Sequence, residues 1–225
     1  MKKKIMVSAV VLVFLVVGGV LYGMMRSADQ SGEAKESYKE AAGRIGRQNF
    51  HPEETIPADW EDSVTAWGQF LSKQYYSGNS KNQEENFEKQ LEQTIKFYEL
   101  QGYEAKEAEE IAKDYVKVSN AIYQKALEEG YQVTEREVEE KVKELRASYY
   151  DPELNENSRR QMELIISAFK NEEDFWDYER DVYQKLLVSE NYVSAVKKEF
   201  WETHPGATYN EWEQYFEDWK ATLAG

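Results

Sequence analysis

The sequence predicts an all-α protein, and three observations support this fold class. Apolar residues recur at steps of three and four along most of the chain, which is the spacing of one helix face. Residues typical of helix starts and helix ends separate these apolar stripes. No segment sustains the alternation of apolar and polar residues that indicates a half-buried strand. We therefore expect a multi-helix domain with one long helix in its C-terminal half.

An N-terminal segment, residues 1–26, differs in composition from the rest of the chain. Three lysines (Lys2 to Lys4) precede Ile5–Met25, a run of 21 uncharged residues. As a helix this run spans roughly 31 Å, which matches a bilayer hydrocarbon core of about 30 Å. The run is longer than the apolar region of a secretory signal, and no good cleavage site follows it. We predict an uncleaved signal anchor that forms a single transmembrane helix.

The charges that flank this helix predict its orientation in the plasma membrane. Three lysines precede the helix and only Arg26 follows it, so the N-terminus is expected in the cytoplasm and the domain outside. Gly19 and Gly23 have the spacing through which two such helices can pack closely, which makes a weak homodimer possible. Residues 27–56 contain few apolar side chains and are predicted to form a flexible stalk.

The remainder of the chain is strongly acidic and lacks cysteine. Residues 1–26 hold four of the 28 basic residues and none of the 43 acidic ones, which leaves a net charge of −19 for the rest. Such a surface repels phosphate backbones, so we expect no nucleic-acid partner. Without cysteine the exported domain has no disulfides, and its stability must come from a packed core.

Residues 57–225 form the predicted helical domain, which opens with three helices. The first begins after Pro57 and ends at Ser77-Gly78-Asn79, and the second ends near Gly102. The third ends at Gly130, a residue that takes the left-handed cap conformation at no steric cost. Their apolar stripes are Trp60, Val64, Trp67, Leu71 and Tyr75; Phe87, Leu91, Ile95 and Tyr98; and Ile111, Tyr115, Val118 and Ile122.

Two shorter helices follow. Thr134 opens the fourth helix, and Glu137 lies three residues later, which is the spacing of a capping box. Asp151-Pro152 ends that helix, because the residue before proline disfavours helical geometry. The stripes of the fourth and fifth helices are Val138, Val142, Leu145 and Tyr149; and Met162, Ile165, Ile166 and Phe169.

The C-terminal half contains the longest predicted helix. Asn171 is a good N-cap for it, and His204-Pro205-Gly206 ends it. Thr208 and Glu211 then repeat the capping-box spacing at the start of a last helix. The stripes of the long and last helices are Phe175, Tyr178, Val182, Leu186, Val193, Val196 and Phe200; and Trp212, Phe216, Trp219 and Leu223.

The joint between the third and fourth helices, within residues 121–146, resembles the same joint in the N-terminal domain of the SurA/PrsA/trigger-factor chaperones. The family pattern there is roughly "hydrophobic–xQ–x–A–xx–G–xx–V–T–xx–E–V". The residues that match it are Gln124, Ala126, Gly130, Val133, Thr134, Glu137 and Val138. Phe169–Trp176 looks like the helix start of the family, and Tyr183–Leu187 looks like its later "xKLL" stretch. The resemblance covers about residues 108–200.

The chain also departs from this family in two places. The short strand with an Asn-Gly turn that usually opens the family's domain has no counterpart before Phe87. Only 25 residues follow Phe200, so we expect no parvulin isomerase domain, which many members carry. The resemblance implies a membrane-anchored, extracytoplasmic chaperone-like protein that binds peptide or unfolded polypeptide without isomerase activity. The alternative is a non-catalytic structural or regulatory protein that docks a single folded partner at the membrane.

Catalytic chemistry has no support in the sequence. There is no cysteine, no G-x-S-x-G motif and no phosphate-binding glycine loop. The two histidines, His51 and His204, are isolated and indicate neither a zinc site nor a catalytic pair. Adjacent acidic residues on a helix point about 100° apart and indicate a solvated face. We expect no enzymatic activity, no cofactor and no metal.

A second apolar face of the long helix supplies the candidate peptide-binding residues Trp176, Tyr183, Leu187 and Trp201. One interpretation is that this face packs against a second neighbouring helix. The other is that it lines an aromatic groove for extended or unfolded peptide. We favour packing for Trp176 and Tyr183. We expect Trp201, which lies near the loop at His204, to be the residue that contacts a ligand.

Overall fold

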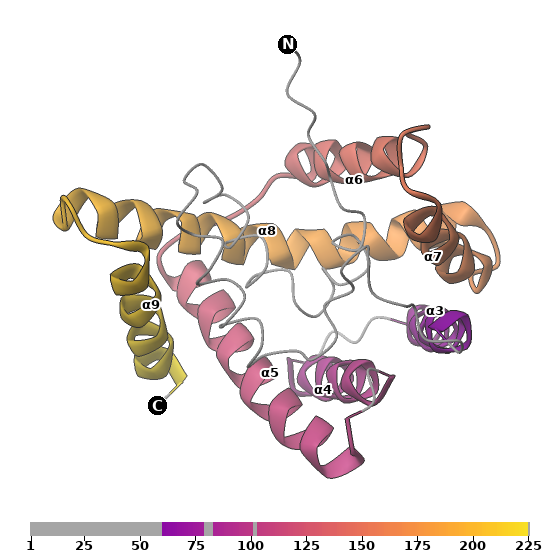
Figure 1. Cartoon of the computed structure of the whole chain (residues 1–225), viewed down its shortest axis with the longest axis horizontal. Helices are drawn as coiled ribbons and strands as arrows, with labels where there is room; N and C mark the ends of the chain where they lie inside the picture. The colour runs from indigo at the N-terminus through magenta and orange to yellow at the C-terminus, as the bar shows by residue number, and fades with distance from the viewer. Residues whose placement is uncertain (1–59, 79–82, 101–102, 225) are drawn as a thin grey trace.

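The computed structural model describes residues 60–78, 83–100 and 103–224, and this part of the chain is all-α. It contains seven helices and no strand, which confirms the predicted fold class for the described residues (Figure 1). The predicted anchor, residues 1–26, and the predicted stalk, residues 27–56, lie outside the described residues. None of the described helices is long and apolar enough to cross a membrane.

Helices α3 (Trp60–Tyr76) and α7 (Glu156–Ser167) lie in close contact because α3 has a glycine at their interface. A Cβ atom at Gly68 would lie 2.9 Å from Ile165 Cα and 3.1 Å from Ala168 Cβ. The shorter distance is to the backbone of α7, which would have to move to make room for a side chain, so glycine at this position allows the close approach. At the N-terminal ends of both helices, Arg160 donates to the two carboxylate oxygens of Glu61 at 3.0 and 2.9 Å.

Helices α4 (Gln83–Leu100) and α5 (Ala105–Glu128) form an antiparallel pair, and the phases of their predicted stripes need correction. In α5 the predicted residues Ile111, Tyr115 and Val118 are only partly buried. Ile122 is buried as predicted. In the N-terminal part of α5 the fully buried face lies one position away from Ile111 and Tyr115, because small side chains there allow neighbouring helices to approach. The buried residues of α5 are Ala108, Ala112, Val116, Ile122 and Ala126. In α4, Phe87 is exposed, and the deeply buried residue is Thr94, whose hydroxyl donates to the Gln90 carbonyl.

The joint between α5 and α6 (Glu135–Tyr149) has the predicted geometry. Gly130 has a φ of +84°, the left-handed conformation expected of a glycine cap. Thr134 Oγ1 accepts a hydrogen bond from the Glu137 amide, and the Glu137 carboxylate accepts one from the Thr134 amide, so the capping box is complete. The predicted stripe of α6 is also confirmed, since Val138, Val142 and Leu145 are buried.

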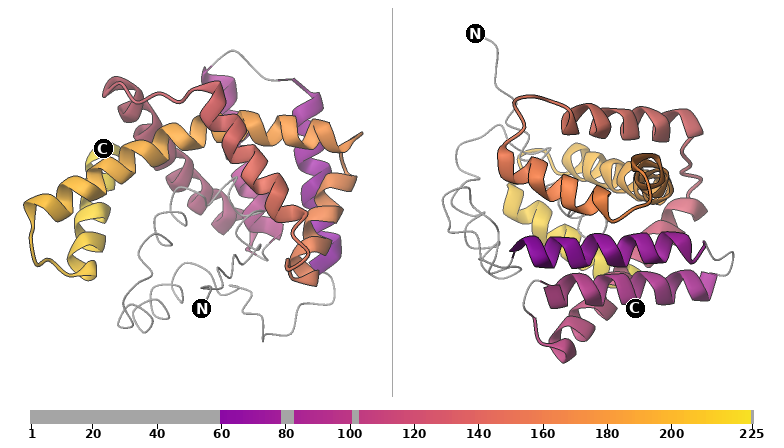
Figure 2. Two further views of the ribbon diagram at one scale, coloured as in Figure 1. Left: turned by 90° about the horizontal axis from the view of Figure 1, so that it is seen from above. Right: turned by 90° about the vertical axis from the view of Figure 1, so that its right-hand side faces the viewer.

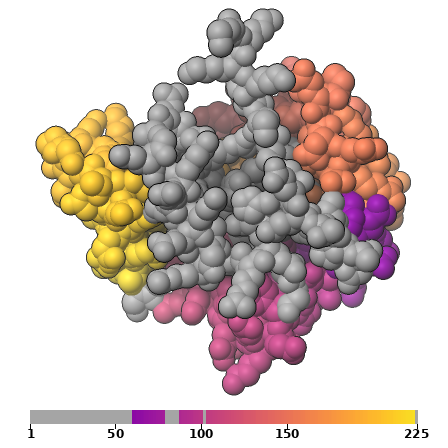
Figure 3. All heavy atoms as spheres, in the orientation of Figure 1, coloured from indigo at the N-terminus to yellow at the C-terminus, as the bar shows by residue number. Residues whose placement is uncertain are grey.

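Helix α8 (Glu172–Thr203) runs across the whole molecule, and the other helices pack along it (Figures 1 and 2). The predicted N-cap is confirmed, because the Asn171 side chain accepts a hydrogen bond from the Asp174 amide at 2.9 Å. Beyond α8 the chain reverses at Gly206, with φ +95°, into α9 (Tyr209–Ala224), which packs against α5. Helix α9 forms one edge of the molecule, and α3 and α7 form the opposite edge (Figure 3).

Candidate functional site

The four predicted peptide-binding residues divide into a buried pair and a partly exposed pair. Trp176 and Tyr183 each expose only 1% of their surface, whereas Leu187 and Trp201 are partly exposed. A side chain without exposed surface contacts no peptide in this conformation. Burial of Trp176 and Tyr183 agrees with the packing interpretation for those two residues. Contact of Leu187 and Trp201 with a ligand stays a prediction.

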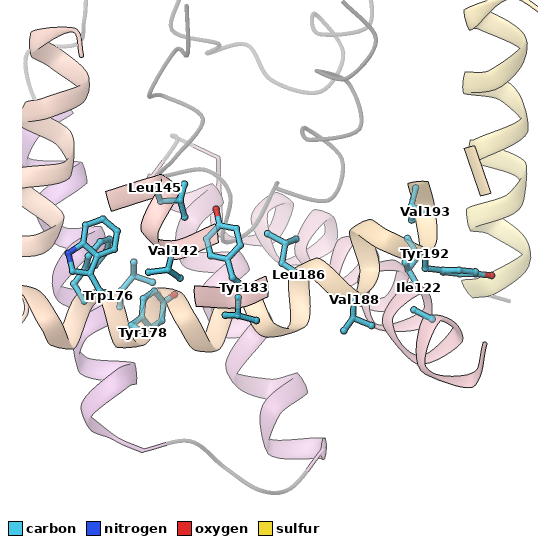
Figure 4. Packing of buried hydrophobic residues seen from close by; sticks show 14 of the residues in the cluster. Ile122, Val142, Leu145, Trp176, Tyr178, Tyr183, Leu186, Val188, Tyr192 and Val193 are labelled. Atoms are coloured by element: carbon cyan, nitrogen blue, oxygen red, sulfur yellow. The ribbon is translucent and has the colours of Figure 1, made fainter. Parts of the chain in front are cut away.

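The contacts of the buried pair show why they belong to the core. Trp176 Nε1 donates to Glu172 Oε1 at 2.7 Å, and the Arg146 guanidinium lies 5.6 Å from the Trp176 ring centroid. Figure 4 shows Tyr183 beside Val142 and Leu145 of α6. These two residues therefore hold α8 to α6.

Trp201 belongs to a group of rings where α8 turns into α9, which we call the aromatic corner. Phe200 is its centre: the ring centroids of His204, Tyr215 and Trp201 lie 4.6, 4.9 and 5.2 Å from it. The residues of the aromatic corner are Phe200, Trp201, His204, Trp212, Tyr215, Phe216 and Trp219. Such spacings lie in the range of favourable aromatic pairs.

The aromatic corner has a buried interior and an exposed rim. Phe200, Trp212 and Phe216 are buried, and the Trp212 and Phe216 rings stack at 5.2 Å with an interplanar angle of 24°. On the rim, 38% of Tyr215 is exposed, and His204 is also exposed. The rim rings thus rest on the buried rings.

Local sequence explains how the two helices meet at the aromatic corner. The Ala207 amide donates to the His204 carbonyl at 3.1 Å, which closes a tight turn around Gly206. Thr208 and Glu211 then form the second predicted capping box, with the Thr208 amide donating to the Glu211 carboxylate at 2.7 Å. The same hydrogen bond lowers the pKa of Glu211, because it stabilises the charged form. Helix α9 therefore starts at once and packs against α5.

Sequence reasoning selected Trp201 by helical phase but missed the other rim residues. The sequence analysis assigned His204 no role, and Tyr215 lies outside the predicted stripe of the last helix. The signal that indicates the whole group is aromatic density, since seven Phe, Trp or Tyr residues fall between Phe200 and Trp219. These aromatic residues form one cluster because the turn at Gly206 brings the end of α8 and the start of α9 together.

A buried carboxyl in α8 was also missed. Glu179 is 5% exposed, and the described residues form no hydrogen bond or ion pair with it. Burial raises the pKa of Glu179 to about 8, because the low-polarity surroundings disfavour the charged form. The sequence contained a signal for this burial, because Glu179 interrupts the apolar stripe between Phe175 and Val182. The hydroxyl of Tyr183, one turn further on, is buried without a hydrogen-bond partner.

A hollow of about 480 Å³ lies between the starts of α3 and α7, and its cations are already engaged. Arg160 forms the bidentate ion pair with Glu61, and Arg159 donates to the carbonyls of Tyr149 and Asp151. Both cations of the hollow thus already have protein partners. Among the described residues, no group of His, Cys, Asp and Glu side chains could hold a metal ion.

Comparisons with protein families, with curated proteins and with solved structures find no match to this chain.

Proposed function

We propose that this protein is a membrane-anchored, extracytoplasmic chaperone-like protein that binds peptide or unfolded polypeptide at the aromatic corner, without isomerase activity. The proposal draws on the apolar N-terminal segment, on the resemblance of the joint at Gly130 and Thr134 to that chaperone family, and on the aromatic corner. One observation carries it: rim rings that are open to solvent rest on a buried ring, Phe200.

Rings arranged in this way suit the binding of varied apolar segments. Tryptophan and tyrosine offer a large contact area and lose few rotamers on binding, which lowers the entropic cost of association. Because Trp201 and Tyr215 both contact Phe200, they are oriented before a ligand arrives. Contacts with partly exposed rings do not require one fixed ligand geometry, so segments of different sequence can bind.

The test is suppression of aggregation of an unfolded client by the full-length chain in a non-ionic detergent. We expect the wild-type chain to suppress aggregation and the double variant Trp201→Ala/Tyr215→Ala to lose most of that effect. The matched control is Phe87→Ala on α4, because Phe87 and Tyr215 are both 38% exposed. Equal suppression of aggregation by the double variant and the control would show that the aromatic corner does not bind the client. No suppression by the wild-type chain with several unrelated clients would contradict the function itself.

Crosslinking in intact cells separates this function from the docking of one folded partner. A photo-reactive residue at position 215 should capture many polypeptides if the aromatic corner binds non-native chains. A single dominant product would favour a structural or regulatory role instead.

A further inference from the structure

The aromatic corner lies in an acidic stretch of the folded domain. Residues 199–219 contain no lysine or arginine. The same stretch contains six acidic residues, which are Glu199, Glu202, Glu211, Glu213, Glu217 and Asp218. Two of them form ion pairs with the lysines that flank the stretch, Glu202 with Lys198 at 3.8 Å and Glu217 with Lys220 at 2.6 Å, so the acids still outnumber the cations around the corner. A concentration of one sign of charge next to an apolar surface attracts ligands of the opposite sign and repels those of the same sign.

The end of α8 adds to this negative field. The last turn of α8 contains no basic residue, so no side-chain cation offsets the negative end of the helix dipole. His204, at the C-cap, is exposed on the rim of the aromatic corner. Rim rings and the negative helix end are therefore adjacent.

Two lysines at the edges of the aromatic corner show that its rings accept cations. Lys197 Nζ lies 5.9 Å from the Trp212 ring centroid, and Lys220 Nζ lies 5.0 Å from that of Phe216. These separations fit the attraction of an ammonium group to a ring face. Among the described residues, no lysine or arginine lies in this way over Trp201 or Tyr215.

We infer that the aromatic corner selects polypeptide segments in which lysine or arginine stands next to an aromatic or aliphatic side chain. The apolar side chain packs on the rim rings, and the cation meets the faces of Trp201 and Tyr215 together with the surrounding carboxylates. This inference rests on the proposed function, because it names the class of segment that the same surface binds. Segments rich in glutamate or aspartate are excluded by the same charges.

The test uses three labelled peptides of equal length that share their aromatic residues and differ only in carrying arginine, glutamine or glutamate. Fluorescence anisotropy measures their binding to the full-length chain in a non-ionic detergent. We expect the arginine peptide to bind about tenfold or more tightly than the glutamate peptide. The difference should shrink as salt is added, because charges at the surface are screened over about 8 Å at physiological ionic strength.

A charge-neutralised variant checks that the corner carboxylates cause the preference. Glu199→Gln/Glu202→Gln/Asp218→Asn changes three exposed carboxylates of the corner into amides of the same shape. We expect it to remove most of the preference, so that the arginine and glutamate peptides bind with similar affinity. The matched control, Glu107→Gln/Glu110→Gln/Asp114→Asn, neutralises three exposed acids at the start of α5 and should keep the preference.

The outcomes separate the two proposals. Equal binding of the arginine and glutamate peptides to the wild-type chain, or tighter binding of the glutamate peptide, overturns the inference and leaves the proposed function standing. A preference that survives in the corner variant also overturns it. Absence of binding by all three peptides, together with no suppression of client aggregation, removes the proposed function.

Discussion

The two ends of α8 use aromatic and acidic side chains in opposite ways. At the N-terminal end, the rings donate hydrogen bonds to carboxylates of the first helical turn. The Tyr150 hydroxyl and Trp176 Nε1 both donate to Glu172, each at 2.7 Å, and the Tyr76 hydroxyl donates to Asp174 at 2.6 Å. These bonds tie α3, α6 and α8 together, and we call this region the locked end.

At the C-terminal end, the aromatic corner contains the same side-chain types without such bonds. Among the described residues, none accepts a hydrogen bond from Trp201 Nε1 or the Tyr215 hydroxyl. The rings contact one another instead, and Glu211 uses its carboxylate to cap α9.

The direction of the helix explains the difference. Acidic side chains are favourable at the positive N-terminal end of a helix and unfavourable at its negative C-terminal end. At the locked end, Glu172 interacts with the dipole and accepts bonds from two rings at once, which lowers its pKa through Trp176, and further through Tyr150 and Arg146. At the aromatic corner, Glu202 lies in the last turn of α8, where its charge opposes the dipole instead of being stabilised by it. The same composition thus gives a structural cluster at one end and an open surface at the other.

The largest expected effect is at the locked end. Replacing Trp176 with alanine should lower the free energy of unfolding by about 3–5 kcal/mol, because it removes a fully buried ring and leaves a cavity. Chemical denaturation of the variant and the wild type measures the difference. A loss of less than about 1 kcal/mol would show that Trp176 does not stabilise the locked end as a buried core residue.

A second prediction concerns the buried acid between the two ends. Burial raises the pKa of Glu179 from its ordinary value of 4.5 to about 8, so over this range the folded state holds a proton that the unfolded state has lost. The contribution of Glu179 to stability is therefore greatest at low pH and falls as pH rises through this window. The fall is at most about 1.4 kcal/mol per pH unit.

Glu179→Gln should remove this pH dependence and should be more stable than the wild type at alkaline pH. Unfolding curves of the two proteins, measured at several pH values between about 4.5 and 8, give the difference in their free energies of unfolding. The contributions of the other titrating groups cancel in this difference. Parallel profiles would show that Glu179 is hydrated or paired in solution.

The two capping boxes allow a matched pair of variants, and we expect the effect of each on stability to be intermediate. Thr134→Ala and Thr208→Ala should each cost about 1 kcal/mol, because each removes the hydroxyl that accepts from a first-turn amide. Only Thr208→Ala should also weaken peptide binding, because only that cap orients the aromatic corner. Equal binding losses in both variants would indicate a global effect of stability.

The smallest stability effects are expected on the rim of the aromatic corner. Trp201→Ala and Tyr215→Ala should each change the free energy of unfolding by no more than about 1 kcal/mol, since both residues are partly exposed. Their effect should appear in client binding instead. A loss of several kcal/mol from Trp201→Ala would make the aromatic corner a second structural cluster and remove the contrast with the locked end.

Features that depend on neighbours in the chain were predictable from the sequence. The caps at Thr134, Asn171 and Thr208 are confirmed because a side chain and an amide three residues away form each of them. The helical class and the reversals at Gly130 and Gly206 follow for the same reason. These contacts need no knowledge of the rest of the fold.

Features that depend on a partner helix were not predictable. The alanine face of α5 is buried because other helices approach it, and a stripe of large apolar residues gave the wrong phase. The close contact at Gly68 needs the position of Ile165, which the sequence does not supply. To predict the aromatic corner, one needs the position of α9 relative to α8 as well as the helical phase of Trp201.

The contact at Gly68 has a consequence for the order in which the chain folds. Helix α4 follows α3 directly, but the ion pair between Glu61 and Arg160 joins residues 99 positions apart. Closing so long a loop must wait until the intervening chain exists, and such distant contacts form slowly. During synthesis from the N-terminus, the face of α3 around Gly68 therefore remains uncovered until α7 has been made. The first described helix to be synthesised is thus among the last to reach its final position.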